Sequence, residues 1–62
     1  MKYTVNIFAS DTVRELDMFD IENYKYEELS NGRVVYYFYD FDGTIKYTLV
    51  LGIDSTILIS EV

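Results

Sequence analysis

Three evenly spaced glycines divide the second half of the chain into short runs of alternating polar and apolar residues. Asn31-Gly32 and Asp42-Gly43 are typical of the tight turns of β-hairpins, and Gly52 opens a third turn. Alternation with a period of two is typical of strands that bury one face. The strands predicted by this pattern cover residues 23–29, 33–39, 44–51 and 56–61. Because hairpin turns join neighbouring antiparallel strands, this half of the sequence predicts an antiparallel meander.

Residues 12–19 have a different pattern, which predicts a short helix. Thr12 and Glu15 have the spacing of a capping box, in which each side chain accepts a hydrogen bond from the main-chain N–H of the other residue. The apolar residues that follow at helical spacing are Val13, Leu16 and Phe19. We expect these side chains to face a sheet. The alternative is a loop followed by a short strand over residues 16–21.

Residues 2–8 add a strand at the beginning, because Tyr3, Val5 and Ile7 alternate with polar residues. The predicted element order is therefore β-α-β-β-β-β within a single domain, residues 1–62. A short helix on one face of an antiparallel meander of about five strands is a common two-layer architecture. The expected fold class is α+β, and a small all-β barrel is the alternative.

The turn around Gly43 decides which aromatic side chains face the core. The pairs predicted by a two-residue turn are Tyr36 with Leu49, Phe38 with Tyr47, and Tyr39 with Lys46. The face then expected to be buried comprises Val34, Tyr36, Phe38, Ile45, Tyr47, Leu49 and Leu51. The opposite face comprises Val35, Tyr37, Tyr39 and Phe41. A three-residue turn with this glycine in the left-handed region changes the parity of one strand. We also expect Tyr24 and Tyr26 on the buried face, which requires the two hairpins to have different turn types.

Cysteine and histidine are both absent from the 62 residues. Their absence excludes disulfides, zinc sites of the Cys and His kind, and imidazole-based acid-base catalysis. A chain this short also has too little core for a deep substrate cleft, and we expect neither a cofactor nor a metal. Small secreted domains usually need disulfides, and the sequence shows no signal peptide and no membrane-spanning apolar run. These features predict a cytoplasmic protein.

The segment Asp40-Phe41-Asp42-Gly43-Thr44 follows an apolar run and resembles the first motif of the haloacid dehalogenase-like hydrolases. The resemblance covers about ten residues. It implies a parallel sheet, with Asp40 as the phosphoryl-accepting nucleophile, Asp42 as general acid or base, and magnesium held nearby. The residues that follow alternate like a strand, and Asp and Gly are also favoured in hairpin turns. The residue pattern therefore favours a turn, and we expect no enzymatic activity.

The chain is strongly acidic, with 11 Asp and Glu residues against 5 Lys and Arg residues and a net charge of −6. A surface that binds nucleic acid or an anionic membrane needs the opposite sign, so we expect neither partner. A basic protein surface is favoured, because opposite charges steer association. The residues predicted to bind such a partner are Asp11, Glu15, Asp17, Asp20, Glu22, Glu27, Glu28, Tyr37 and Tyr39.

These features predict a small protein-binding module that covers a basic surface of its partner. Carboxylates that mimic the phosphates of nucleic acid would occupy the groove of a nucleic-acid-processing enzyme and inhibit it, with aromatic residues as anchors. Small acidic domains of phages and mobile elements, including anti-defence proteins, fit this description by analogy. The alternative is a structural, self-associating protein, in which residues 56–60 or the face with Tyr37 and Tyr39 pair across a two-fold axis to form a homodimer.

Overall fold

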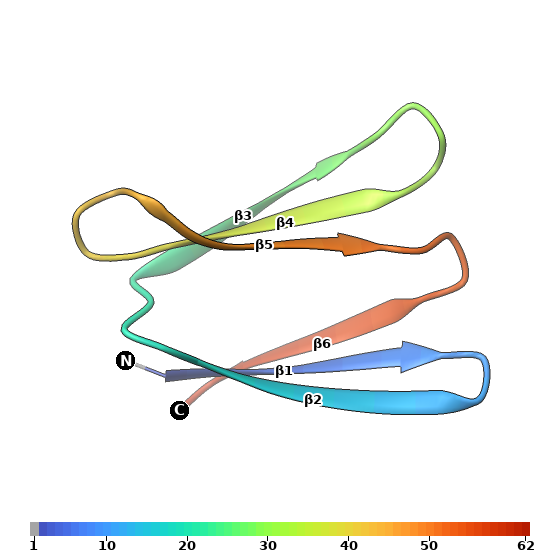
Figure 1. Cartoon of the computed structure of the whole chain (residues 1–62), viewed down its shortest axis with the longest axis horizontal. Helices are drawn as coiled ribbons and strands as arrows, with labels where there is room; N and C mark the ends of the chain where they lie inside the picture. Colours follow the sequence, from blue (N-terminus) through green and yellow to red (C-terminus); the bar gives the residue numbers. More distant parts are fainter. Residues whose placement is uncertain (1) are drawn as a thin grey trace.

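The structure, a computed structural model, describes residues 2–62, which form six strands in two three-stranded antiparallel sheets. Sheet A has the strand order β2-β1-β6 and sheet B the order β3-β4-β5, and Figure 1 shows them as two layers. The strands are β1 (Lys2–Ala9), β2 (Thr12–Phe19), β3 (Asn23–Glu28), β4 (Val34–Tyr39), β5 (Ile45–Leu51) and β6 (Thr56–Glu61). No helix occurs in the described residues, so the fold is all-β.

The predicted helix over residues 12–19 is wrong, because this segment forms strand β2. A short turn after Ala9 sets β2 antiparallel to β1 over its full length. Met18 is then buried and Leu16 packs against the core, so β2 alternates with a period of two. A helix this short is marginal without tertiary support, whereas the strand gains a complete hydrogen-bonded ladder and a buried face. The predicted α+β class is therefore incorrect, and the all-β alternative is the one that fits.

The two sheets pack face to face around a core of aromatic and aliphatic side chains. Val5, Ile21 and Phe38 are fully buried. The ring of Tyr3, on sheet A, lies 6.5 Å from that of Phe38 and 5.9 Å from that of Tyr24, both on sheet B, with edge-to-face geometry. Such pairs add to the free energy gained by burial. Since Ile21 belongs to the link between β2 and β3, the core also fixes the crossing from one sheet to the other.

Both glycine turns of sheet B have the same type. In each turn, three loop residues separate the two residues of the last hydrogen-bonded pair. The glycine N–H donates to the carbonyl of the residue three positions earlier. Gly32 and Gly43 have φ angles of 85° and 81°, a left-handed conformation that side chains disfavour. The predicted two-residue turn at Gly43 is therefore wrong, and so is the predicted difference between the two hairpins.

The three-residue turn at Gly43 would by itself shift the β4–β5 pairing by one residue, and a β-bulge in β5 shifts it back. The predicted pairs that are confirmed are Tyr36 with Leu49 and Phe38 with Tyr47. The predicted pair of Tyr39 with Lys46 is wrong, because Tyr39 pairs with Ile45 and Lys46 is the extra residue. Ile45 is therefore exposed rather than buried. Tyr24 and Tyr26 lie on the core-facing side of β3, as predicted, because the three-residue turn at Gly32 pairs them with Phe38 and Tyr36. The bulge in β5 does for the second hairpin what a different turn type was predicted to do.

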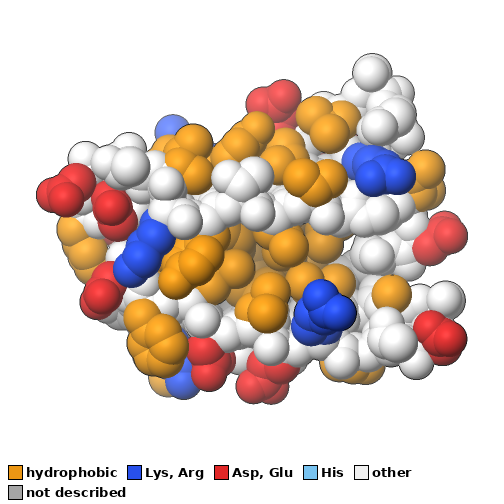
Figure 2. All heavy atoms as spheres, viewed as in Figure 1, with side chains coloured by type: hydrophobic (Ala, Val, Ile, Leu, Met, Phe, Trp, Pro, Cys, Tyr) orange, Lys and Arg blue, Asp and Glu red, His pale blue; other side chains and the backbone are white. Residues whose placement is uncertain are grey.

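Two three-stranded sheets leave the sandwich open along two sides. On one side a groove of about 250 Å³ is lined by residues of β1, β2 and β5, and Figure 2 shows hydrophobic side chains exposed in a band between the sheets. On the other side a hollow of about 160 Å³ is lined by residues of β3, β4 and β6. The surface therefore consists of two outer sheet faces and two open sides bordered by edge strands.

Candidate functional site

The outer face of sheet A carries exposed apolar side chains with two carboxylates between them. Val13, Glu15, Asp17 and Phe19 follow one another on this face of β2, and Phe8 of β1 lies opposite Val13. The exposed fractions of Phe8, Val13 and Phe19 are 40%, 68% and 54%. Contiguous exposed apolar groups mark interaction surfaces more often than isolated ones do. We call these five residues the acidic-apolar face.

Neighbouring polar groups hold one of the two carboxylates in place. Lys2 Nζ lies 3.6 Å from Asp17 Oδ2, and the hydroxyl of Thr4 donates a hydrogen bond to Asp17 Oδ1 at 3.2 Å. The same ammonium lies 5.6 Å from the centre of the Phe19 ring, within the range of a cation–π interaction. Glu15 forms no ion pair with any residue in the range 2–62. Its charge is therefore available to a partner.

The predicted binding residues of the N-terminal half do not form one surface. A helix would have made Asp11 a neighbour of Glu15, and Asp17 a neighbour of Asp20. The strand instead places only Glu15 and Asp17 on the same face, because its side chains alternate. Asp11 lies in the turn between β1 and β2. Asp20 lies in the link to β3, where Oδ2 is 3.9 Å from Lys46 Nζ.

The other predicted residues belong to sheet B or to its entrance. Glu27, Tyr37 and Tyr39 lie on the outer face of sheet B, but both tyrosines are half-buried by their neighbours. Glu28 has the opposite parity at the end of β3, and Glu22 precedes that strand. The tyrosines on this face thus make cross-strand contacts within the sheet, which leaves less of their rings exposed than the sequence pattern indicates.

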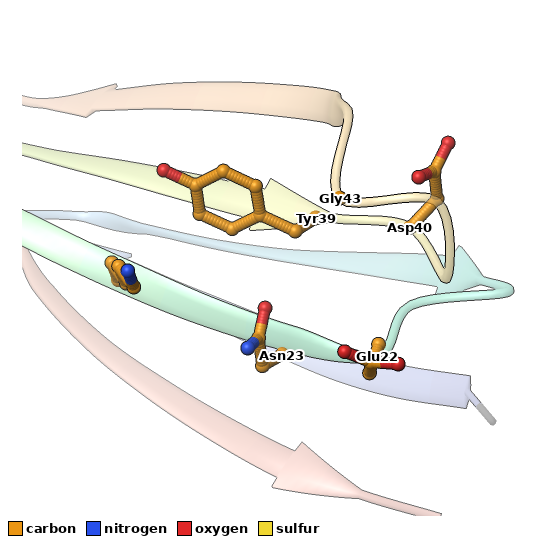
Figure 3. Close-up of a pocket in the computed structure, with 6 residues that line it drawn as sticks. Glu22, Asn23, Tyr39, Asp40 and Gly43 are labelled. Atoms are coloured by element: carbon orange, nitrogen blue, oxygen red, sulfur yellow. The ribbon is translucent and has the colours of Figure 1, made fainter.

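A polar hollow of about 200 Å³ lies at one end of sheet B. It is lined by Glu22, Asn23, Lys25, Tyr39, Asp40 and Gly43. Figure 3 shows the Asp40 carboxylate directed away from Glu22. Asp40 Oδ1 accepts main-chain hydrogen bonds from Asp42 at 2.9 Å and Thr44 at 3.0 Å. Asp40 therefore stabilises a turn between antiparallel strands, and the parallel sheet implied by the resemblance to the hydrolases is not present in residues 2–62.

Two core tyrosines keep their protons at neutral pH. Loss of hydration on burial raises the pKa of Tyr3, and the nearby carboxylate of Glu61 raises it further. Burial also raises the pKa of Tyr36. The hydroxyl of Tyr3 donates to the main-chain carbonyl of Glu22 at 3.5 Å. The Tyr3 hydroxyl therefore links β1 to the segment that precedes β3.

Within residues 2–62, no group of three or more Asp, Glu, His or Cys side chains is placed to hold a metal ion. The same stretch includes no helix with the length and apolarity needed to cross a membrane. No protein-family model matches the chain, and neither the curated proteins nor the solved structures include one similar to it. Exposure and charge therefore identify the acidic-apolar face as the candidate site.

The apolar part of this face is what the sequence pattern misses. The helical spacing predicts Val13 and Phe19 to be turned toward a sheet, yet both are exposed on the outside of one. Residues 13, 15, 17 and 19 share one side of a strand, and this period of two is the signal that identifies them. This period of two is hard to recognise because Val13, Leu16 and Phe19 also have helical spacing.

Proposed function

We propose that this protein is a small acidic binding module that docks on a basic protein surface through its acidic-apolar face. The observation that carries the proposal is the alternation on β2, which places the exposed Val13 and Phe19 on either side of Glu15 and Asp17. Apolar side chains supply affinity where a partner buries them, and carboxylates select a cationic partner and speed the encounter. The net charge of −6 favours the same class of partner.

We further propose that the partner is a nucleic-acid-processing enzyme, which the module inhibits by covering its basic groove. Side chains on one face of a strand recur about every 7 Å, so Glu15 and Asp17 form a short row of carboxylates, of which Asp17 is paired with Lys2 and Glu15 is not. A groove lined with Lys and Arg to hold phosphates would accept such a row. Such an encounter would take place in the cytoplasm, a location that stays a prediction from the absence of cysteine.

The first experiment identifies the face that touches the partner. A photo-cross-linking residue replaces Val13 in one sample and, as a matched control, Val50 in another. Val50 is 52% exposed and lies on the outer face of sheet B. In a low-salt extract of the source cells, we expect the probe at Val13 to capture a protein rich in Lys and Arg, and the probe at Val50 to capture less of it. Equal capture from both faces would contradict the proposed site.

The second experiment tests the charge on the purified pair. Glu15→Lys places a positive charge against a basic surface, so we expect binding to weaken by about tenfold, mainly through a slower association rate. Glu27→Lys makes the same change on sheet B and should have a smaller effect. The affinity of the wild-type protein should fall steeply from low to high salt concentration. Salt-independent binding, or an equal response of the two variants, would refute the proposal.

A further inference from the structure

The four edge strands of the two sheets differ in how they are protected. β2 carries Arg14, Glu15 and Asp17, and β5 carries a bulge at Lys46. β3 carries Lys25, Glu27 and Glu28. Charged side chains and bulges keep an edge from pairing with another chain. β6, with the sequence Thr-Ile-Leu-Ile-Ser-Glu, is uncharged until its last residue and has neither device.

The hydrogen-bonding groups of β6 face outward at its most apolar residues. The N–H of Val62 donates to the carbonyl of Lys2 at 2.8 Å, which makes this an antiparallel pair of the hydrogen-bonded kind. Such pairs recur at every second residue. The N–H and C=O groups of Leu58 therefore point to β1, and those of Ile57 and Ile59 point to the open edge.

We propose that β6 pairs antiparallel with β6 of a second copy of this chain, across a two-fold axis centred on Leu58. Each copy's Ile57 then exchanges both main-chain hydrogen bonds with Ile59 of the other copy. This register keeps core-facing residues opposite core-facing residues. A shift by one residue would turn them to the outside. The two copies of sheet A become one continuous six-stranded sheet.

The side chains around this edge fit a second copy of the same chain. Leu58 is 54% exposed and Tyr26 is 64% exposed, and both line the hollow between β6 and β3. A two-fold axis perpendicular to the sheets near these residues also brings β3 toward its own copy. Lys25 and Glu27 flank Tyr26 on the outer face of β3. The charges of β3 oppose pairing with most chains, but a two-fold copy centred on Tyr26 would set each Lys25 opposite the other copy's Glu27, where the charges attract.

The first test measures the oligomeric state by sedimentation velocity from micromolar to near-millimolar concentration. We expect the wild-type chain to dimerise. Leu58→Lys places two ammonium groups directly opposite each other at the axis and should leave a monomer. Val13→Lys is the matched control, since Val13 is also exposed on the outer face of sheet A but lies on the other edge strand. This control should remain a dimer. Circular dichroism checks that both variants are folded.

The second test fixes the register. The chain has no cysteine, so Leu58→Cys introduces a single thiol at the proposed axis, where the two copies' Cβ atoms come close enough for a disulfide on mild oxidation. We expect rapid formation of a covalent dimer, and slow formation for Val13→Cys. A wild-type chain that is monomeric throughout, a Leu58→Lys variant that still dimerises, or equal cross-linking of the two cysteine variants would overturn the proposal. Because the acidic-apolar face lies at the other edge of sheet A, these outcomes leave the proposed binding function untouched.

Discussion

Phe38 is one of the buried residues that join the two sheets. Its side chain is fully buried, and its ring lies 6.5 Å from Tyr3 of sheet A and 5.8 Å from Tyr24 of its own sheet. A small domain has few such side chains, so each one carries a large share of the net stability. The neighbouring aromatic Phe41, only three residues along, is 56% exposed in a turn.

The contrast between these two phenylalanines gives a prediction about stability. Phe38→Ala removes a fully buried ring and leaves a cavity, so we expect the free energy of unfolding to fall by about 3–5 kcal/mol, enough to unfold much of the protein. Phe41→Ala removes an exposed ring and should change it by less than about 0.5 kcal/mol. Urea unfolding followed by circular dichroism measures both. A small loss for Phe38→Ala would contradict the core described above.

The raised pKa of Tyr3 predicts a loss of stability at high pH. The folded-state pKa lies above the ordinary value of 10.0, so the unfolded chain loses this proton first as the pH rises. The stability linked to the shift is therefore fully present below pH 10 and is lost as the pH rises through the folded-state pKa. We expect the free energy of unfolding to fall above pH 10 and to fall less steeply in Tyr3→Phe. Urea unfolding at several pH values checks this, and equal slopes would argue against the effect.

At the scale of elements, the β4–β5 hairpin shows how one side chain determines a turn. Asp40 accepts two main-chain hydrogen bonds across a loop whose glycine is left-handed. The β5 bulge then restores the parity, which puts Tyr47 and Leu49 against the core. Turn formation thus explains the presence of Asp40.

Removal of this acceptor gives a prediction at the same scale. Asp40→Ala leaves two turn N–H groups without their carboxylate, so we expect the free energy of unfolding to fall by about 1–2 kcal/mol. Asp42→Ala changes a carboxylate two residues away that accepts neither of these bonds, and its effect should be smaller. Thermal unfolding of the two variants distinguishes them. If Asp42→Ala proves the more damaging, the assignment of the acceptor is wrong.

At the scale of the whole molecule, the main facts are an excess of negative charge and a sandwich that is open on two sides. The two ion pairs within residues 2–62, Lys2 with Asp17 and Lys46 with Asp20, join partly exposed side chains. Exposed pairs contribute little. Repulsion among the remaining carboxylates should therefore dominate the electrostatics of the folded state.

This balance predicts the effect of salt on stability. Added sodium chloride screens the repulsion more than it weakens the two exposed pairs, so we expect the free energy of unfolding to rise by about 1 kcal/mol between low and moderate ionic strength. Replacing Glu27 and Glu28 together by glutamine makes the net charge less negative and should reduce the salt dependence of the stability. Urea unfolding at both ionic strengths checks this. A fall in stability with salt would mean that the ion pairs dominate.

The amino-acid pattern was sufficient to predict the strands whose signal is local. Alternation in residues 2–8 and from residue 23 onward corresponds to β1, β3, β4, β5 and β6, and the glycine turns lie where predicted. The core-facing direction of Tyr24 and Tyr26 is also predicted, because two aromatic rings gain more free energy from burial than the charged Lys25 and Glu27 that alternate with them. These features need only neighbouring residues, because strand period and turn chemistry act over a few positions.

Whether residues 12–19 form a helix or a strand depends on tertiary contacts, and the candidate site depends on the outcome. Val13, Leu16 and Phe19 fit a helix as well as the alternate residues fit a strand. The choice depends on β1, whose ladder and buried face are available only after the chain folds back on itself. Once β2 pairs there, Glu15 and Asp17 share a face with exposed apolar side chains, while Asp11 and Asp20 fall elsewhere. Non-local pairing outweighs local propensity here, since a short helix cannot supply the same buried area.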